Sequence, residues 1–323
     1  YAIVADVTNF GADKALLGQK IEAAALRANA SSDGYQITGD VRINGTPASV
    51  ELVRKKGDPA AELHLSAKLD DAARHRLGFD VGSAVVGAIP VRLTARIGGD
   101  DTAQRMSVDA DLTPVKIDNL LPGWEKAAGR NAHASFSFVK SAKATSFDDL
   151  NISGDGANVQ GSVALDSSGN ISSANFPVFA LSEGDKLTLK ADRGSDGVLK
   201  VVMRGDVYDG RNFVKSSMAN SGDAGRKKQP DIDLDVKIGT VAGDNGETLR
   251  GLDMSMSRRG GHIRSFNLNS KIGRDTPLTG DMRVRARDNH PVVYLETADA
   301  GALFRFTDMY PRMYGGQMWV AMD

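Results

Sequence analysis

The stretch DAGALFRFTDMYPRMYGGQMWVAMD, residues 299–323, is the one part of the chain whose apolar residues do not alternate at every second position. Instead they recur at three- and four-residue steps, as they do on one face of a helix. These residues are Ala302, Leu303, Phe306, Met309, Tyr310 and Met313. Asp299 is a suitable N-cap, and Pro311 should end the helix near Tyr310. We expect Phe306 to be buried on this face together with Leu303, Met309, Tyr310 and Met313, and Phe304 to be more exposed.

After this predicted helix, Gly315 and Gly316 allow the chain to reverse into a strand that contains Trp319. A short helix with a Phe/Met/Tyr face needs a large apolar surface to lie on. The remainder of the chain predicts that surface, because apolar and polar residues alternate along most of it. In residues 231–238, for example, Ile232, Leu234, Val236 and Ile238 alternate with three aspartates and a lysine.

Alternation of this kind is typical of antiparallel strands with one apolar and one polar face. Lys20–Ala30 is rich in helix formers, but a turn at residues 31–34 precedes the alternating segment Tyr35–Asn44, so we interpret the pair as a hairpin. Residues 70–77, DDAARHRL, predict a short helix capped by Asp70 or Asp71 and ended by Gly78.

The predicted fold is therefore mostly β: a long antiparallel curled sheet, a trough or groove, with a few short helices. Too few residues are helical to cover the apolar faces, so the sheet should fold on itself as a sandwich, a barrel or a curled trough. Residues 1–215 form the first β region, residues 216–230 a polar, flexible loop, and residues 231–323 a second β region with the short amphipathic helix. We expect these parts to make one continuous, elongated domain.

Composition excludes several classes of function. The 323 residues carry a net charge of −1, which gives no general attraction to nucleic acid, and the absence of cysteine excludes disulfides and zinc–thiolate sites. Asp231, Asp233 and Asp235 resemble the start of a calcium loop, but the glycine and glutamate that such a loop needs are absent. We expect no catalytic residues, no metal and no cofactor. The chain begins with Tyr1 and not with Met, and we interpret it as part of a longer protein.

Several segments resemble the AsmA-like envelope proteins, in particular the YhdP-like branch and, more distantly, TamB-like proteins. The segments are LDDAARHRLGF (69–79), ADLTPVKIDNLLPGWEKAAGR (110–130), RGDVYDGRNF (204–213) and ADAGALFRFTDMYPRMYGGQMWVAMD (298–323). The resemblance covers most of the chain from Leu69 onward, and Pro311 departs from it. It implies a periplasmic part of a protein anchored in the inner membrane by an N-terminal helix, with long curled β-sheets that carry phospholipids along a hydrophobic groove.

We therefore expect an intermembrane lipid transport module that shields acyl chains, with no enzymatic activity. The alternative is a structural or assembly scaffold of the cell envelope with a closed β core, which docks other envelope proteins. The candidate groove residues are Leu187, Leu189, Val201, Met203, Leu234, Val236, Met254, Met256, Met282, Val284, Leu303 and Phe306. The basic residues Arg283, Arg285 and Arg287 are interpreted as a solvated strand face, with contact to lipid phosphates as the alternative.

Overall fold

The computed structural model describes residues 2–16, 18–78, 81–98, 104–140, 144–219, 230–285 and 290–322. It is mostly β, with three short α-helices in these ranges, as the sequence predicts. Contacts divide the chain into two compact units. Unit 1 comprises residues 1–120 and 125–155, and unit 2 comprises residues 121–124 and 156–323.

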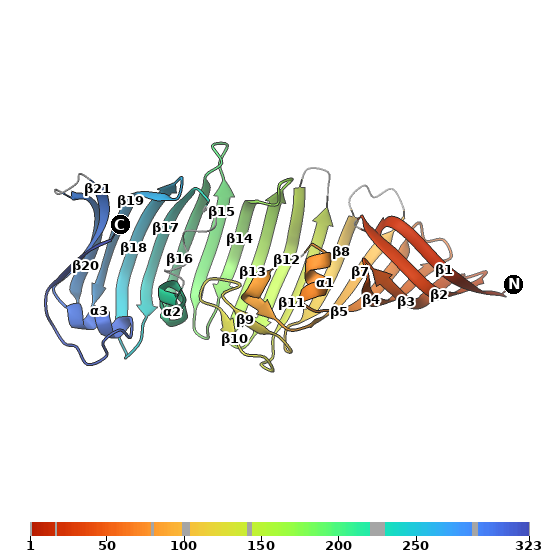
Figure 1. Ribbon diagram of the computed structural model, residues 1–323, viewed down its shortest axis with the longest axis horizontal. Coiled ribbons are helices and arrows are strands. Elements are labelled where there is room, and N and C mark those ends of the chain that lie inside the picture. Colours follow the sequence, from red (N-terminus) through yellow and green to blue (C-terminus); the bar gives the residue numbers. More distant parts are fainter. Residues whose placement is uncertain are drawn as a thin grey trace. The chain divides into compact units, whose positions relative to one another are not determined.

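The large sheet of unit 1 is antiparallel, and its strands pair in the order β1-β2-β3-β4-β5-β7-β8-β11, with β12 next to β11 (Figure 1). These strands are β1 (Ala2–Leu16), β2 (Gln19–Ser31), β3 (Gly34–Ile43), β4 (Thr46–Lys55), β5 (Ala61–Leu69), β7 (Ile89–Ile97), β8 (Gln104–Asp111), β11 (His133–Lys140) and β12 (Ala144–Gly154). The strand predicted at Lys20–Ala30 is confirmed as β2. Its pairing with β1 and β3 outweighs the helix propensity of its residues.

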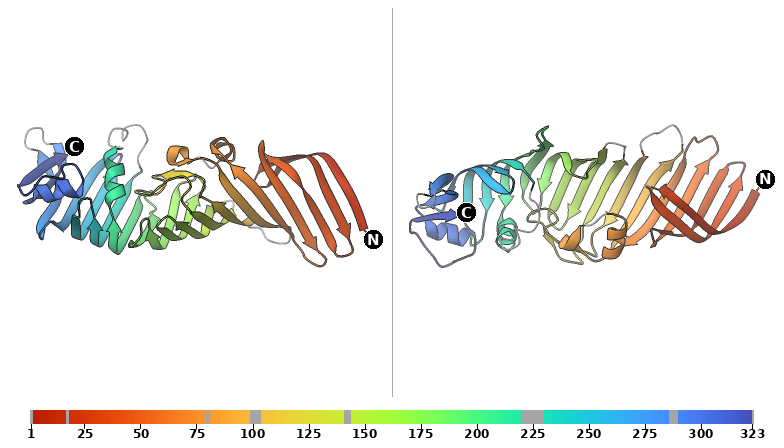
Figure 2. Two further views of the ribbon diagram at one scale, coloured as in Figure 1. Left: turned by 90° about the horizontal axis from the view of Figure 1, so that it is seen from below. Right: turned by 45° about the horizontal axis from the view of Figure 1, so that its top comes forward.

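A smaller antiparallel sheet in unit 1 consists of β6 (Val85–Val86), β9 (Lys116–Asp118) and β10 (Glu125–Lys126). It lies close to α1 (Asp71–Arg76) and the 3₁₀ helix η1 (Gly82–Ala84). The predicted cap of α1 is confirmed, because Asp70 Oδ1 accepts a hydrogen bond from Ala73 N at 2.7 Å. Together α1 and the small sheet lie on one side of the large sheet (Figure 2).

In unit 2 the strands pair in sequence order, from β13 to β22. They are β13 (Ala157–Asp166), β14 (Ile171–Ala180), β15 (Lys186–Arg193), β16 (Leu199–Asp209), β17 (Ile232–Ala242), β18 (Thr248–Arg259), β19 (His262–Ile272), β20 (Thr276–Arg285), β21 (His290–Thr297) and β22 (Met318–Met322). The helices are α2 (Arg211–Ala219) and α3 (Ala300–Phe306).

The expectation of a purely antiparallel sheet is wrong, because β16 and β17 pair in parallel and make the sheet mixed. Parallel neighbours need a crossover connection of about a dozen residues or more, and α2 begins that connection. Residues 216–219 of the predicted loop form the end of α2, and residues 220–229 lie outside the described residues. The sheet is open: among the described residues, β1 pairs only with β2, and β22 only with β21.

The predicted C-terminal helix begins where expected. Asp299 Oδ1 accepts a hydrogen bond from Ala302 N at 3.0 Å, and Phe306 is buried while Phe304 is half-buried. The helix ends at Phe306, however, four residues before Tyr310, and Asp308 has a φ of 57°. The expectation that Met309, Tyr310 and Met313 share its buried face is therefore wrong, since all three side chains are exposed. After Thr307 the helical pattern of hydrogen bonds is broken: Asp308 N donates to Arg305 O at 3.1 Å, and Met309 N donates to Phe304 O at 3.0 Å. The chain then returns to the start of α3, where Gly301 N donates to Gly315 O at 2.9 Å.

Candidate apolar binding surface

Seven of the predicted groove residues in unit 2 lie side by side on one face of the sheet, in two parallel rows. The first row consists of Phe176, Leu189, Met203, Val236, Met254, Leu268, Gly280, Leu295 and Val320, each paired in register with the next. The second consists of Ala174, Ala191, Val201, Leu234, Met256 and Phe266. We call these two rows the unit-2 strip; no charged residue interrupts either of them.

Most side chains of the unit-2 strip are half-buried, including Leu189, Met203, Leu234 and Met254, while Val236 is buried. Gly280 keeps the strip continuous although it has no side chain. A Cβ at this position would lie 2.7 Å from both Leu295 Cδ2 and Phe266 Cε1, so these neighbours already fill the space. The sheet itself therefore does not fully bury this apolar surface.

The other predicted groove residues lie around the unit-2 strip. Leu187 is buried and packs against Gly205. A Cβ on Gly205 would lie only 2.5 Å from Leu187 Cδ2. Met282 and Val284 lie on β20, opposite Val293 and Pro291, and the side chain of Val284 is 60% exposed. Leu303 and Phe306 lie on α3. This helix contacts the turns that follow β17 and β19, at the ends of these strands and not at the middle of the strip.

Helix α3 is fixed over the turns that follow β17 and β19. Asp244 N donates a hydrogen bond to Phe306 O at 3.0 Å, and Arg305 Nε donates to Glu247 Oε1 at 2.9 Å. Both of these charged side chains are largely buried, which fixes the helix more firmly than an exposed pair would. Gly273 lies against Ala302 and Asp299 on the same side.

The opposite face of the same strands is polar and is held by ion pairs between neighbouring strands. Lys237 Nζ lies 3.0 Å from Asp253 Oδ2, and Arg259 Nη1 lies 2.8 Å from Asp233 Oδ1. The hydrogen bond from Arg259 lowers the pKa of the Asp233 carboxyl below its ordinary value. Asp235 is paired with Arg204. Of the three aspartates that resemble a calcium loop, Asp233 and Asp235 are thus paired with arginines, and Asp231 accepts a hydrogen bond from Gly260 N at 2.7 Å.

Unit 1 carries a second apolar strip, none of whose residues we named as groove candidates from the sequence. One row consists of Leu26, Gly39, Val50, Leu65, Leu93, Val108 and Phe136, and the next of Ala28, Ile37, Leu52, Leu63, Ala95, Met106, Phe138 and Phe147. Phe147 packs edge-on against Phe136 and Phe138, with ring centroids 5.6 and 5.4 Å apart. Leu63, Leu65, Met106 and Phe138 are buried, so this strip is more core-like than the unit-2 strip.

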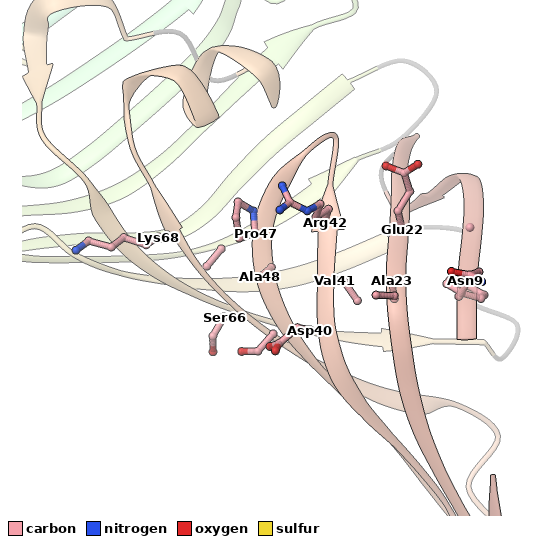
Figure 3. A pocket seen from close by; sticks show the side chains of 15 residues that line it. Asn9, Glu22, Ala23, Asp40, Val41, Arg42, Pro47, Ala48, Ser66 and Lys68 are labelled. Atoms are coloured by element: carbon pink, nitrogen blue, oxygen red, sulfur yellow. The ribbon is translucent and has the colours of Figure 1, made fainter. Parts of the chain in front are cut away.

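A hollow of about 1030 Å³ lies over β1–β5 in unit 1 (Figure 3). Small residues such as Ala23 and Ala48 line it together with the charged residues Glu22, Arg42 and Lys68. In Figure 3 the charged ends of these three side chains point in different directions. Because no set of polar atoms converges on one point, we assign no ligand to this hollow.

Two buried cations in the segments that carry the family resemblance have structural partners. Arg74 donates to the carbonyl oxygens of Leu69, Gly87 and Val85 at 2.9, 2.7 and 2.8 Å. Lys126 Nζ donates to the carbonyl oxygens of Ala127 and Arg130 at 2.9 Å, and burial lowers the pKa of its ammonium group. These residues fix loops to the sheet and are not arranged for catalysis.

The chain matches no family model, no curated protein and no solved structure. The resemblance to AsmA-like envelope proteins therefore remains a prediction from the four segments named above. Within the described residues, no group of three or more His, Asp or Glu side chains is placed to hold a metal ion. None of the helices in these ranges is long and apolar enough to cross a membrane.

Proposed function

We propose that the protein is a lipid transport module whose apolar sheet faces shield the acyl chains of phospholipids between the inner and outer membranes. The observation that carries this proposal is the unit-2 strip, an unbroken apolar path across nine strands whose side chains are mostly half-buried. Covering such a surface with an acyl chain is favourable by roughly 0.8 kcal/mol for each CH₂ group removed from water.

The dimensions of the strip agree with this ligand. At ~4.8 Å between neighbouring strands, the first row spans roughly 38 Å. One leaflet contributes about half of the ~30 Å hydrocarbon core of a bilayer, so an acyl chain is about 15 Å long. The strip is thus longer than one chain, as a path along which lipids move should be. It offers few polar atoms with which to distinguish headgroups.

The resemblance of the sequence to AsmA-like proteins supplies the cellular setting of the proposal. That setting is the periplasm, in a longer protein anchored in the inner membrane. In this role the sheet is a curled trough with an accessible apolar face, and the function is not catalytic. Other envelope proteins are further candidate partners in the same setting.

The second candidate is a scaffold of the cell envelope, in which the apolar faces are ordinary core. The buried side chains of Leu63, Leu65 and Met106 in unit 1 favour this role. Mass spectrometry of lipids that co-purify with the protein in the absence of detergent distinguishes the two functions. Phospholipids in near-stoichiometric amount support the transport module, and protein free of lipid supports the scaffold.

A further inference from the structure

The polar face of β18–β22, opposite the unit-2 strip, carries two aromatic side chains among hydrogen-bonding residues. One row in register consists of Asp253, Asn269, Thr279, Glu296 and Trp319, and the next of Ser255, Asn267, Asp281, Tyr294 and Ala321. Trp319 is 71% exposed although it lies within a strand. Tyr and Trp side chains are enriched at interfaces, because each combines a large apolar ring with a polar group that can form a hydrogen bond.

The two aromatic rings form a stacked, supported platform. The ring centroids of Tyr294 and Trp319 lie 6.3 Å apart, with an angle of 29° between the planes. The guanidinium of Arg283 lies 5.2 Å from the centre of the Tyr294 ring. Arg283 is itself held by Asp281, at 2.8 Å from Nε to Oδ1, and by Glu296, at 3.5 Å from Nη2 to Oε2. The two aromatic rings, the guanidinium and the two carboxylates thus lie side by side on the polar face.

We propose that this surface, the Trp319–Tyr294 platform, binds a glycan chain built of neutral or N-acetylated hexopyranose units. The apolar C–H face of a pyranose ring stacks on an indole or phenol ring, which is flat, electron-rich and partly apolar. The hydroxyl groups around the sugar ring need both donors and acceptors. Glu296 and Asp281 accept, Arg283 donates, and the amides of Asn267 and Asn269 do both.

The neighbours of the platform argue against other partners. A lipid surface would force the carboxylates of Asp281 and Glu296 toward acyl chains or anionic headgroups, both of which are unfavourable. Nucleic acid would bring phosphates next to the same carboxylates. A glycan without charge avoids both costs and uses the carboxylates as hydrogen-bond acceptors.

The two tryptophans of the chain make the platform directly measurable. Trp124 is 1% exposed, so acrylamide in solution quenches mainly the fluorescence of Trp319. The full chain is titrated with chitotetraose, cellohexaose and maltohexaose, and both acrylamide quenching and heat of binding are recorded. We expect at least one of these glycans to protect Trp319 from quenching, with a dissociation constant in the millimolar range or below.

Variants then locate the binding. Trp319→Ala should weaken glycan binding by at least about tenfold, and Glu296→Gln should weaken it to a smaller extent. Tyr314→Ala is the matched control, because Tyr314 is 78% exposed and its ring contacts Arg305 of α3, which is not part of the platform. Its affinity for the glycan should stay unchanged.

Two results would overturn the proposal: no protection by any glycan of the panel, or equal binding by wild type and Trp319→Ala. Loss of self-association or of binding to phosphatidylglycerol vesicles in Trp319→Ala, with no glycan bound by wild type, would instead assign the platform to a second copy or to a membrane. Co-purifying lipid in Trp319→Ala should equal that of wild type, so this test is independent of the proposed lipid function.

Discussion

The ring of Phe306 lies directly against the backbone of Gly243 and leaves no room for a Cβ at that position. Gly243 follows β17, and Phe306 is the last residue of α3, so this contact joins two segments about sixty residues apart in the sequence. Gly243 N also donates to Glu247 O at 2.9 Å, and Glu247 binds Arg305. One aromatic side chain thus sits at the centre of the contacts that hold α3 to the sheet.

Replacing Phe306 with Ala should therefore lower the free energy of unfolding by about 3–5 kcal/mol, because a buried aromatic ring is lost and a cavity remains. Phe304→Ala is the control. Phe304 is half-buried and packs edge-on against the exposed ring of Tyr310, at 5.3 Å between centroids, so its loss should be clearly smaller. Urea denaturation of both variants gives the comparison. Equal losses would mean that the orientation of α3 is wrong.

Gly301→Ala should loosen the segment that follows α3. A Cβ on Gly301 would lie 2.5 Å from Tyr314 Cα and 2.7 Å from Gly315 N, and both are backbone atoms that cannot move aside alone. The variant should therefore break the hydrogen bond from Gly301 N to Gly315 O, which is 2.9 Å long. Limited proteolysis should cleave residues 309–316 faster than in wild type.

Gly11→Ala provides the control for this substitution, because nothing lies within 4 Å of a Cβ built on Gly11. Its stability and its rate of proteolysis should stay close to those of wild type. If Gly301→Ala behaves in the same way as Gly11→Ala, the close approach of residues 313–315 to α3 is wrong.

The sequence predicted those elements whose signals are local. Two-residue alternation identified most strands. Asp70 and Asp299 marked the starts of two helices, because each side chain accepts a hydrogen bond from the backbone amide three residues later. The end of α3 was less well predicted, because Met309, Tyr310 and Met313 continue the apolar pattern after the helix has stopped. An apolar pattern predicts which face of a helix can be buried, but it does not predict the residue at which contacts with other segments end the helix.

The parallel pairing of β16 with β17 was missed for a different reason. Alternation is typical of antiparallel strands, but β16 and β17 alternate although they pair in parallel, so here only the connection between them distinguishes the two arrangements. Helix α2 opens that connection, and its last four residues, 216–219, belong to the small and polar stretch that we interpreted as a loop from the sequence. The stacking of Trp319 on Tyr294 depends in turn on the register between β21 and β22, which are connected through α3, and no local pattern predicts that register.

The candidate surface was predicted in part. The face of each strand follows from alternation, and residues such as Met203 and Met254 lie on the same side of the sheet. The equivalent residues of unit 1 show the same alternation and could have been named as well. Whether such a face is buried depends on contacts distant in sequence: Met106 is 1% exposed, whereas Met203 on a similar strand is half-buried.

Acid should remove a specific contribution to stability at the start of α2. Arg211 Nε donates to Asp209 Oδ1 at 2.8 Å, and this hydrogen bond lowers the pKa of the Asp209 carboxyl. A carboxyl whose pKa is lowered in the folded state stabilises the fold at a pH above its pKa in the unfolded chain, which is about 3.9. That stabilisation is lost as the pH falls through the pKa of the folded state. Asp209→Asn should therefore be less stable than wild type at neutral pH, and the difference should shrink below about pH 4. Urea denaturation at a series of pH values tests this, and a difference that does not vary with pH would contradict it.

The apolar strip can be tested with two neighbouring residues of β16 that face opposite sides of the sheet. Met203→Asp places a carboxylate in the unit-2 strip, where an acyl chain in contact would remove its water, so bound phospholipid should fall severalfold or disappear. Val202→Asp is the matched control. Val202 is 36% exposed on the polar face and lies between Lys190 and Asp235, so the new carboxylate stays solvated and the cation on one side offsets the like charge on the other. Mass spectrometry of co-purifying lipid, with melting temperatures of both variants, decides between the two proposed functions. If Met203→Asp folds and still carries as much lipid as Val202→Asp, the strip is not the lipid path. If wild type carries no lipid, and Met203→Asp fails to fold while Val202→Asp is stable, the strip is closed core and the scaffold role gains support.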